Sequence, residues 1–264
     1  CTIENGNSFP SIETFVKISE VLDIDINSFF NLNEVDRAMV NKYWENLPDY
    51  LNGADCKMMC VVDTSGSMTG NNAAAPINVA IGLGMYCAER IGGPFKNHYI
   101  SFSSTPQLIK IEGSDFVDKV RRIYKTDLCE NTDLCATFDL LLKTALKPGV
   151  KKTDIPDTIV VISDMEIDSG TRSWRNNLNV RWTSDNAATE MERMRQKWAS
   201  YGFILPKLIY WNVDARHNTI LDAGPNVTFV SGMSPIIFKQ VLTGKTGYDL
   251  MLEILLSDRY KNII

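Results

Sequence analysis

The sequence contains very little histidine, with two residues in 264, His98 and His217. Histidine is the most frequent general base in enzymes, and together with cysteine it supplies the ligands of zinc sites. Cysteine is also sparse, since the whole chain has six residues of this type. These counts argue against histidine-dependent catalysis, a zinc centre and a disulfide scaffold. Three cysteines fall in apolar runs and are expected to be free thiols in a core: Cys56, Cys60 and Cys87.

Long apolar runs are missing as well. The longest, such as IPDTIVVIS, are far shorter than the roughly 20 residues of a membrane-spanning helix, and no leader of basic and apolar residues opens the chain. We therefore expect a soluble, cytoplasmic protein without a membrane partner. Lys plus Arg number 27 against 32 Asp plus Glu, and this net charge of −5 gives no general attraction for nucleic acids or anionic lipids. Such a partner would need a local basic patch.

Sequence motifs of common enzymes are absent. The chain has neither a G-x-x-x-x-G-K-[ST] phosphate loop nor a G-x-S-x-G nucleophile elbow. Asp63 ends an apolar run, as does the nucleophile of haloacid-dehalogenase-like phosphatases. Those enzymes need a second carboxylate two residues later, where this chain has Ser65. We therefore expect a protein that is not an enzyme.

What the sequence does have is regular alternation of short apolar runs with amphipathic segments over residues 55–264. This alternation predicts an α/β domain with a doubly wound, mostly parallel sheet and helices on both faces, of the Rossmann-like kind. The predicted strands are Met58 to Asp63, His98 to Phe102, Thr158 to Asp164, Lys207 to Val213 and Val227 to Val230. The predicted helices are Pro76 to Arg90, Phe116 to Ile123, Thr137 to Leu146, Asn186 to Tyr201, Pro235 to Leu242 and Tyr248 to Ser257.

A small helical segment is predicted before this domain, over residues 1–32, followed by a connecting helix and linker over 33–54. The string IENGNSFPSIETFVKISEVLDIDINSFF resembles the rear half of a phage-repressor-like helix-turn-helix domain. In that family the residues that read the major groove would lie upstream of Cys1. Because the chain starts with Cys and not Met, we expect a fragment or a processed product. Two ordinary amphipathic helices remain the alternative interpretation of residues 1–32.

Oxygen-bearing side chains gather where predicted strands end. The strand CVVD ends at Asp63 and is followed by Ser65 and Ser67, Asp164 ends the strand TIVVISD, and Thr132 precedes a predicted helix. In open α/β sheets, ligands bind at the carboxyl ends of the strands. Carboxylate and hydroxyl oxygens suit a hard divalent cation. Each residue alone could be a helix cap or turn former, but the joint pattern predicts a metal site.

The motifs DTSGSM, NTDL and SDMEID, with GFILPKLIYWNV and VTFVSGMS, resemble von Willebrand factor A domains that carry a metal-ion-dependent adhesion site. The resemblance is strongest to the Ro autoantigen (TROVE-type) proteins and to a related family of uncharacterised bacterial and viral proteins. It implies that Ser65, Ser67 and Thr132 bind the metal ion directly, while Asp63 and Asp164 act mainly through bound water.

The same resemblance implies a function. One coordination position of the ion, Mg²⁺ or else Mn²⁺ or Ca²⁺, stays open for an acidic group. The expected protein is therefore a non-catalytic, metal-dependent binding module whose protein partner presents an Asp or Glu.

A second binding region is predicted in SGTRSWRNNLNVRWT, residues 169–183, which has three arginines, two tryptophans and no acid. Arginines can contact phosphates and tryptophans can stack on bases, as in proteins that hold single-stranded RNA. The candidate residues are Arg172, Trp174, Arg175, Arg181 and Trp182. The alternative is a solvated loop whose tryptophans pack on the domain. The second functional hypothesis is thus nucleic-acid association, with RNA in a Ro-like ribonucleoprotein or with DNA through a helix-turn-helix completed upstream.

Overall fold

The computed structural model describes residues 33–51, 57–69, 75–103, 105–125, 133–165, 184–214 and 227–233, with positions 237, 251, 252, 255 and 256. The sequence predictions for residues 1–32 and for the loop at 169–183 lie outside these residues. So do most of the two helices predicted at the C-terminal end.

A six-stranded sheet forms the centre of the domain, in the order β3-β2-β1-β4-β5-β6. Its strands are β1 (Met58–Asp63), β2 (His98–Phe102), β3 (Leu108–Lys110), β4 (Thr158–Ser163), β5 (Lys207–Asn212) and β6 (Val227–Ser231). All neighbouring pairs are parallel except β2 with β3. The predicted α/β fold with a mostly parallel sheet is confirmed. The antiparallel strand β3 was not predicted, because three residues are too few to show a strand period.

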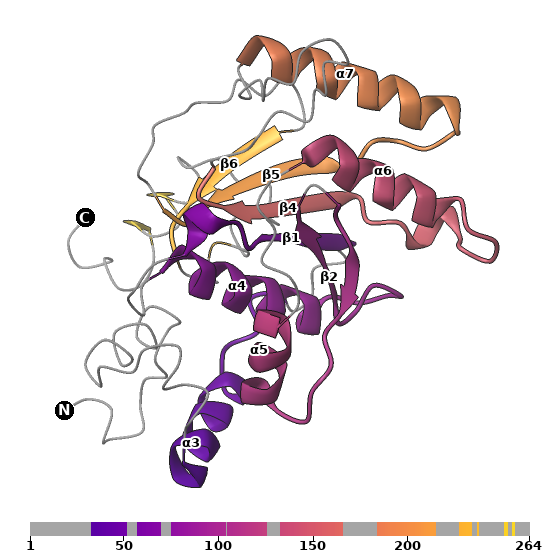
Figure 1. Cartoon of the computed structure of the whole chain (residues 1–264). Helices are drawn as coiled ribbons and strands as arrows, with labels where there is room; N and C mark the ends of the chain where they lie inside the picture. The colour runs from indigo at the N-terminus through magenta and orange to yellow at the C-terminus, as the bar shows by residue number, and fades with distance from the viewer. Residues whose placement is uncertain are drawn as a thin grey trace.

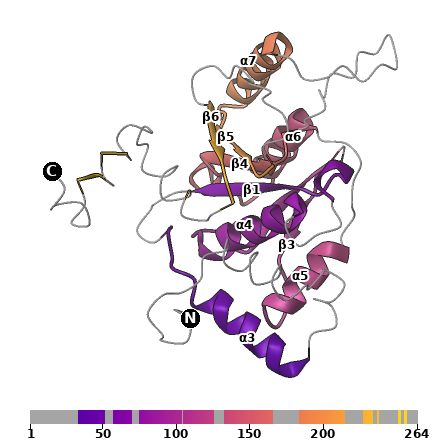
Figure 2. The ribbon, with the colours of Figure 1, turned by 90° about the vertical axis from the view of Figure 1, so that its left-hand side faces the viewer.

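Helices cover both faces of the sheet (Figures 1 and 2). On one face lie α3 (Glu34–Glu45), α4 (Pro76–Arg90) and α5 (Phe116–Lys125), and on the other lie α6 (Leu134–Ala145) and α7 (Ser184–Ser200). Strand β1 is buried on both sides because its side chains alternate between two cores. Met58, Cys60 and Val62 pack toward α4, whereas Met59 and Val61 pack toward α6 and α7.

Helix α4 packs very close to β1 at Gly84. A Cβ atom at this position would overlap the Cγ2 atom of Val62, so the contact requires glycine. Cys87 of the same helix is fully buried, and its thiol lies 3.3 Å from the Met58 sulfur. Cys60 is buried as well, so the prediction of core thiols is confirmed for these two cysteines. Cys56 lies outside the described residues.

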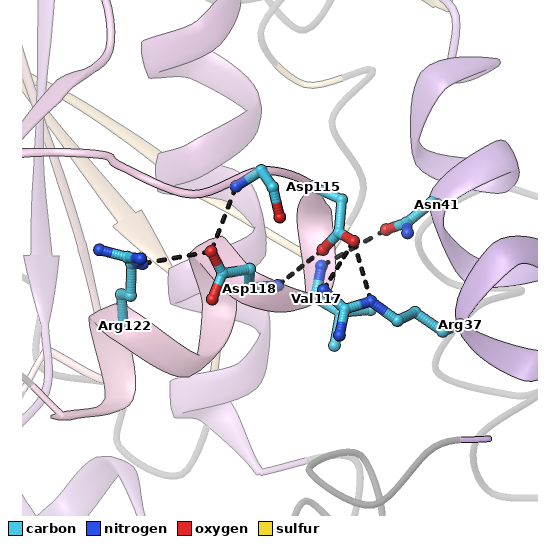
Figure 3. A network of polar contacts seen from close by, with 7 residues as sticks. Arg37, Asn41, Asp115, Val117, Asp118 and Arg122 are labelled. Atoms are coloured by element: carbon cyan, nitrogen blue, oxygen red, sulfur yellow. Dashed lines mark hydrogen bonds and ion pairs between the residues drawn. The ribbon is translucent and has the colours of Figure 1, made fainter. Parts of the chain in front are cut away.

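Helix α3 is clamped to the domain by polar contacts near its start. The Arg37 guanidinium pairs with Asp115 at 2.7 Å, and the Asn41 side chain accepts from the Val117 N–H at 3.4 Å (Figure 3). Burial alone would raise the pKa of Asp115, but the Asp118 N–H and the Arg37 charge outweigh it and lower this pKa. The ion pair between Arg37 and Asp115 therefore stays intact at neutral pH and weakens only as the pH falls below the ordinary range of an Asp carboxyl.

The apolar end of α3 is held by Trp44. Its ring stacks on Phe116 with centroids 4.3 Å apart, and its indole N–H donates to Glu89 at 2.8 Å. Glu89 belongs to α4 and also pairs with Lys119 of α5 at 2.7 Å. One carboxylate thus links three helices, and the segment before β1 is packed as part of the core on this face.

Among the described residues, no helix is both long enough and apolar enough to cross a bilayer.

We predict that Trp44→Ala lowers the free energy of unfolding by about 3 kcal/mol, because it removes a buried aromatic ring and leaves Glu89 without one of its donors. Urea unfolding followed by circular dichroism measures the change. Val35→Ala on the same helix is the matched control, since Val35 is 77% exposed, and it should change stability by less than about 0.5 kcal/mol. Equal stability of both variants would show that α3 is not part of the core.

Candidate functional site

Asp63 is the last residue of β1 and lies in the middle of the sheet, beside the ends of β2 and β4. Its side chain is fully buried. One carboxylate oxygen accepts from the Ser65 N–H at 2.9 Å, and the other accepts from the Ser163 hydroxyl at 2.5 Å. These two donors fix the orientation of the carboxylate at the carboxyl edge of the sheet, where ligands of this fold class bind.

Ser65 and Ser67 follow in a tight turn. Ser65 precedes a short 3₁₀ helix, η1 (Gly66–Met68), and the turn brings the two hydroxyl oxygens within 3.0 Å of each other. Adjacent ligands of an octahedral Mg²⁺ ion, each about 2.1 Å from the metal, are also about 3.0 Å apart. The hydroxyl pair therefore already has the spacing that two neighbouring ligand positions require.

Asp164 reaches the same place from the next strand. It follows β4, which pairs with β1, and it is 5% exposed. Its N–H lies 3.1 Å from the sulfur of Met68, so η1 packs directly on the end of β4. Met165 then turns the chain with a φ of 70°, a left-handed conformation that is uncommon outside glycine. Its N–H donates to the Ser163 hydroxyl at 3.0 Å, which holds this turn.

Burial of Asp63, with a smaller contribution from the Asp164 charge, raises the pKa of its carboxyl from the ordinary 3.8 to about 6. Hydrogen bonds from Ser163 and Ser65 oppose the shift, but these donors are neutral. The negative charge of the Asp63 carboxylate is thus only partly balanced by its hydrogen-bond donors. A divalent cation next to it would supply the missing positive charge.

The donor set at this site fits a hard cation. Asp63, Ser65, Ser67 and Asp164 offer only oxygen, and the hydroxyl of Thr64 in the same loop is buried with no hydrogen-bond partner among the described residues. No three His, Cys, Asp or Glu side chains of the described segments form a metal-ligand group. A site whose oxygens come largely from hydroxyls is weakly charged, so its ion would attract a further anionic ligand.

The remaining predicted residues fall outside the described part of the chain. These are Thr132 and the region of Arg172, Trp174, Arg175, Arg181 and Trp182. The residue after Thr132 is described, since Asp133 caps α6 by accepting from the Ala136 N–H at 2.8 Å. Asp133 is therefore the N-cap residue of α6.

Two residues of the site escaped sequence analysis. Ser163 was assigned only to the strand, although it binds Asp63 across the sheet, and Met68 was not assigned any contact. A polar residue at the end of an otherwise apolar buried strand, as in TIVVIS, was the available signal for Ser163. No sequence pattern pointed to the Met68 contact.

Comparison with known proteins bears on the fold of the chain. Uncharacterized protein L728 of Acanthamoeba polyphaga mimivirus is 24% identical over 225 residues, which cover 83% of this chain and 36% of that protein. The crystal structure of the Deinococcus radiodurans RO (RSR) protein superposes with a TM-score of 0.51 at 17% identity, over 77% of this chain and 36% of that one. This similarity shows a shared fold.

The chain spans about a third of the length of both relatives. A family model described as a domain of unknown function, DUF7788, matches residues 57–254, the span that begins just before β1 and contains the site. The chain therefore belongs to the DUF7788 family.

Proposed function

We propose that this protein is a non-catalytic binding module that depends on a divalent metal ion. Ser65, Ser67 and Thr132 would bind the ion directly, and Asp63 and Asp164 would act mainly through bound water. The observation that carries the proposal is the 3.0 Å spacing of the Ser65 and Ser67 hydroxyls beside the buried Asp63 and Asp164. Mg²⁺ is the expected ion, with Mn²⁺ or Ca²⁺ as alternatives.

The roles of the residues follow from their contacts. Ser163 and the Ser65 N–H hold the Asp63 carboxylate, so that it can accept hydrogen bonds from metal-bound water without rotating. A bound ion would supply Lewis acidity to the group that completes its coordination shell. Because hydroxyls contribute little negative charge, an Asp or Glu of a protein partner would bind strongly at an open position.

The placement of histidine supports a role without catalysis. His98 begins β2, whereas Asp63 pairs with Phe102 at the other end of that strand, so this imidazole is remote from the site. His217 lies outside the described residues.

Nucleic-acid association is the second candidate. It is supported by the Ro-like fold and by the arginines and tryptophans of residues 169–183. Such binding would weaken steeply with rising salt, because phosphate contacts release counterions, and it would not require the metal ion.

We predict that Mg²⁺ or Mn²⁺ raises the melting temperature of the chelator-treated protein. At a concentration 100-fold above the dissociation constant, a ligand specific for the folded state adds about 2.7 kcal/mol. Differential scanning fluorimetry should show the shift for the parent, and a much smaller one for Ser67→Ala, whose side chain is only partly buried. Thr69→Ala, in the same loop and exposed, is the control that should respond like the parent. If Mg²⁺ or Mn²⁺ raises the melting temperature of Ser67→Ala as much as that of the parent, the serine pair does not bind the metal ion.

We also predict that Asp63→Asn stabilises the metal-free protein at pH 8. The raised pKa means that the ionised carboxylate destabilises the folded state above about pH 6, by up to about 3 kcal/mol for a shift of this size. This penalty shrinks as the pH falls from 6 toward 3.8, the ordinary value. Asn keeps the shape and can still bond to Ser65 and Ser163.

Urea unfolding of the parent and Asp63→Asn in the presence of a chelator, at pH 8 and pH 4.5, checks this sign. The variant should be more stable at pH 8, and the difference should be smaller at pH 4.5. If Asp63→Asn is less stable than the parent at pH 8, the ionised Asp63 carboxylate stabilises the fold. No destabilisation would then remain for a metal ion to relieve.

A further inference from the structure

The edge of the sheet opposite Asp63 carries exposed lysines at the starts of β1 and β5 and before β2, with the exposed Asp157 between Lys57 and Lys207. Strands β1, β4 and β5 are parallel neighbours and begin at one level, as Lys57, Asp157 and Lys207 show. The Asp157 N–H donates to the Lys57 carbonyl and the Lys207 N–H donates to the Asp157 carbonyl, both at 2.8 Å. Lys96 precedes β2, the parallel neighbour on the other side of β1. All three lysines are exposed.

Two loops end at the same edge. Helices α6 and α7 lie side by side on one face and lead into the starts of β4 and β5 (Figure 1). Lys152, in the loop before β4, donates to the Gly202 carbonyl at 3.0 Å in the loop before β5. Lys151 is exposed beside it. We call the surface formed by Lys57, Lys96, Lys151, Lys152, Lys207 and Ile204 the amino edge.

The amino edge has an excess of positive charge. Against its five lysines, the described residues of the same loops and strand starts include two carboxylates, Asp154 and Asp157, and Glu112, which follows β3, pairs with Lys110 at 3.4 Å. No ion pair in the described segments involves Lys57, Lys96, Lys151 or Lys207. A chain with a net charge of −5 thus concentrates cations at one end of its sheet.

Apolar side chains project at this edge too. Ile204 is 92% exposed and Tyr201 is 52% exposed. An almost fully exposed isoleucine beside lysines matches surfaces that insert a side chain at the lipid interface while cations contact headgroups. RNA is a weaker match, because single-stranded RNA is held by stacking of successive bases on several aromatic rings. In the loop 201–207, Lys152 covers the Phe203 ring at 5.0 Å, which leaves Tyr201 as the one exposed ring of that loop.

We propose that the amino edge is a docking surface for an anionic lipid bilayer, with its lysines at the headgroup phosphates and Ile204 in the interface. This binding is separate from the proposed metal-dependent function, since the two surfaces lie at opposite ends of the parallel strands and the lysines need no metal ion.

The test is co-sedimentation of the chain with vesicles in the presence of a chelator. The protein should sediment with phosphatidylcholine vesicles that contain phosphatidylserine and stay in solution with pure phosphatidylcholine. The double variant Lys151→Gln/Lys207→Gln should partition about 25-fold less, since each lysine near such a surface contributes roughly fivefold. Lys42→Gln/Arg193→Gln removes the same charge from exposed positions elsewhere and should bind like the parent.

Ile204→Ser tests the apolar contribution separately. It should bind several-fold more weakly than the parent with the same dependence on salt, because the lysines are intact. Melting temperatures confirm that each variant is folded. The proposal is overturned if the parent does not sediment with phosphatidylserine vesicles at physiological salt, or if the two charge variants bind these vesicles equally. It is also overturned if the parent binds an oligouridylate through the edge lysines and does not bind the vesicles.

Discussion

The parallel pairing of β1 with β4 is the contact on which the rest of the structure depends. Their register, from Met58 opposite Thr158 to Val62 opposite Ile162, sets Asp63 level with Ser163 at the carboxyl edge of the sheet. The same pairing buries the alternating side chains of β1 in two separate cores. A shift of one residue would exchange the two faces of the strand and separate Asp63 from its donor. Core packing and site geometry are therefore fixed by one register.

The sequence predicted the sheet best where strands are fully buried. The predicted bounds of β1 and β2 match the structure, because continuous apolar runs that end in polar residues mark both ends of a buried strand. Helix α4 was also predicted with the observed bounds, from Pro76 at its first position to Arg90. The short strand β3 was missed, since Leu108–Lys110 pairs only with the first three residues of β2 and has no pattern of its own.

The sequence predicted where four candidate ligands lie, and it did not predict the contacts that hold them. Asp63, Ser65, Ser67 and Asp164 could be named because their oxygen-bearing side chains end or follow predicted strands. Ser163 and Met68 could not, because their roles depend on which strand lies beside which, and strand order is a long-range property. The lysines of the amino edge were invisible for the same reason. They are dispersed along an acidic chain and come together only through the register of the strands, so net charge alone suggested no affinity for anionic surfaces.

The hydrogen bond between Ser163 and Asp63 has a consequence for folding. The two residues are 100 positions apart in the chain, and closing such a loop is slow compared with forming local helical contacts. Pairing of β1 with β4 closes a loop that includes α4, β2 and α6. A partly folded molecule would therefore lack the oriented carboxylate. Under the proposed function, binding of a metal ion at this site would report that the centre of the sheet has closed.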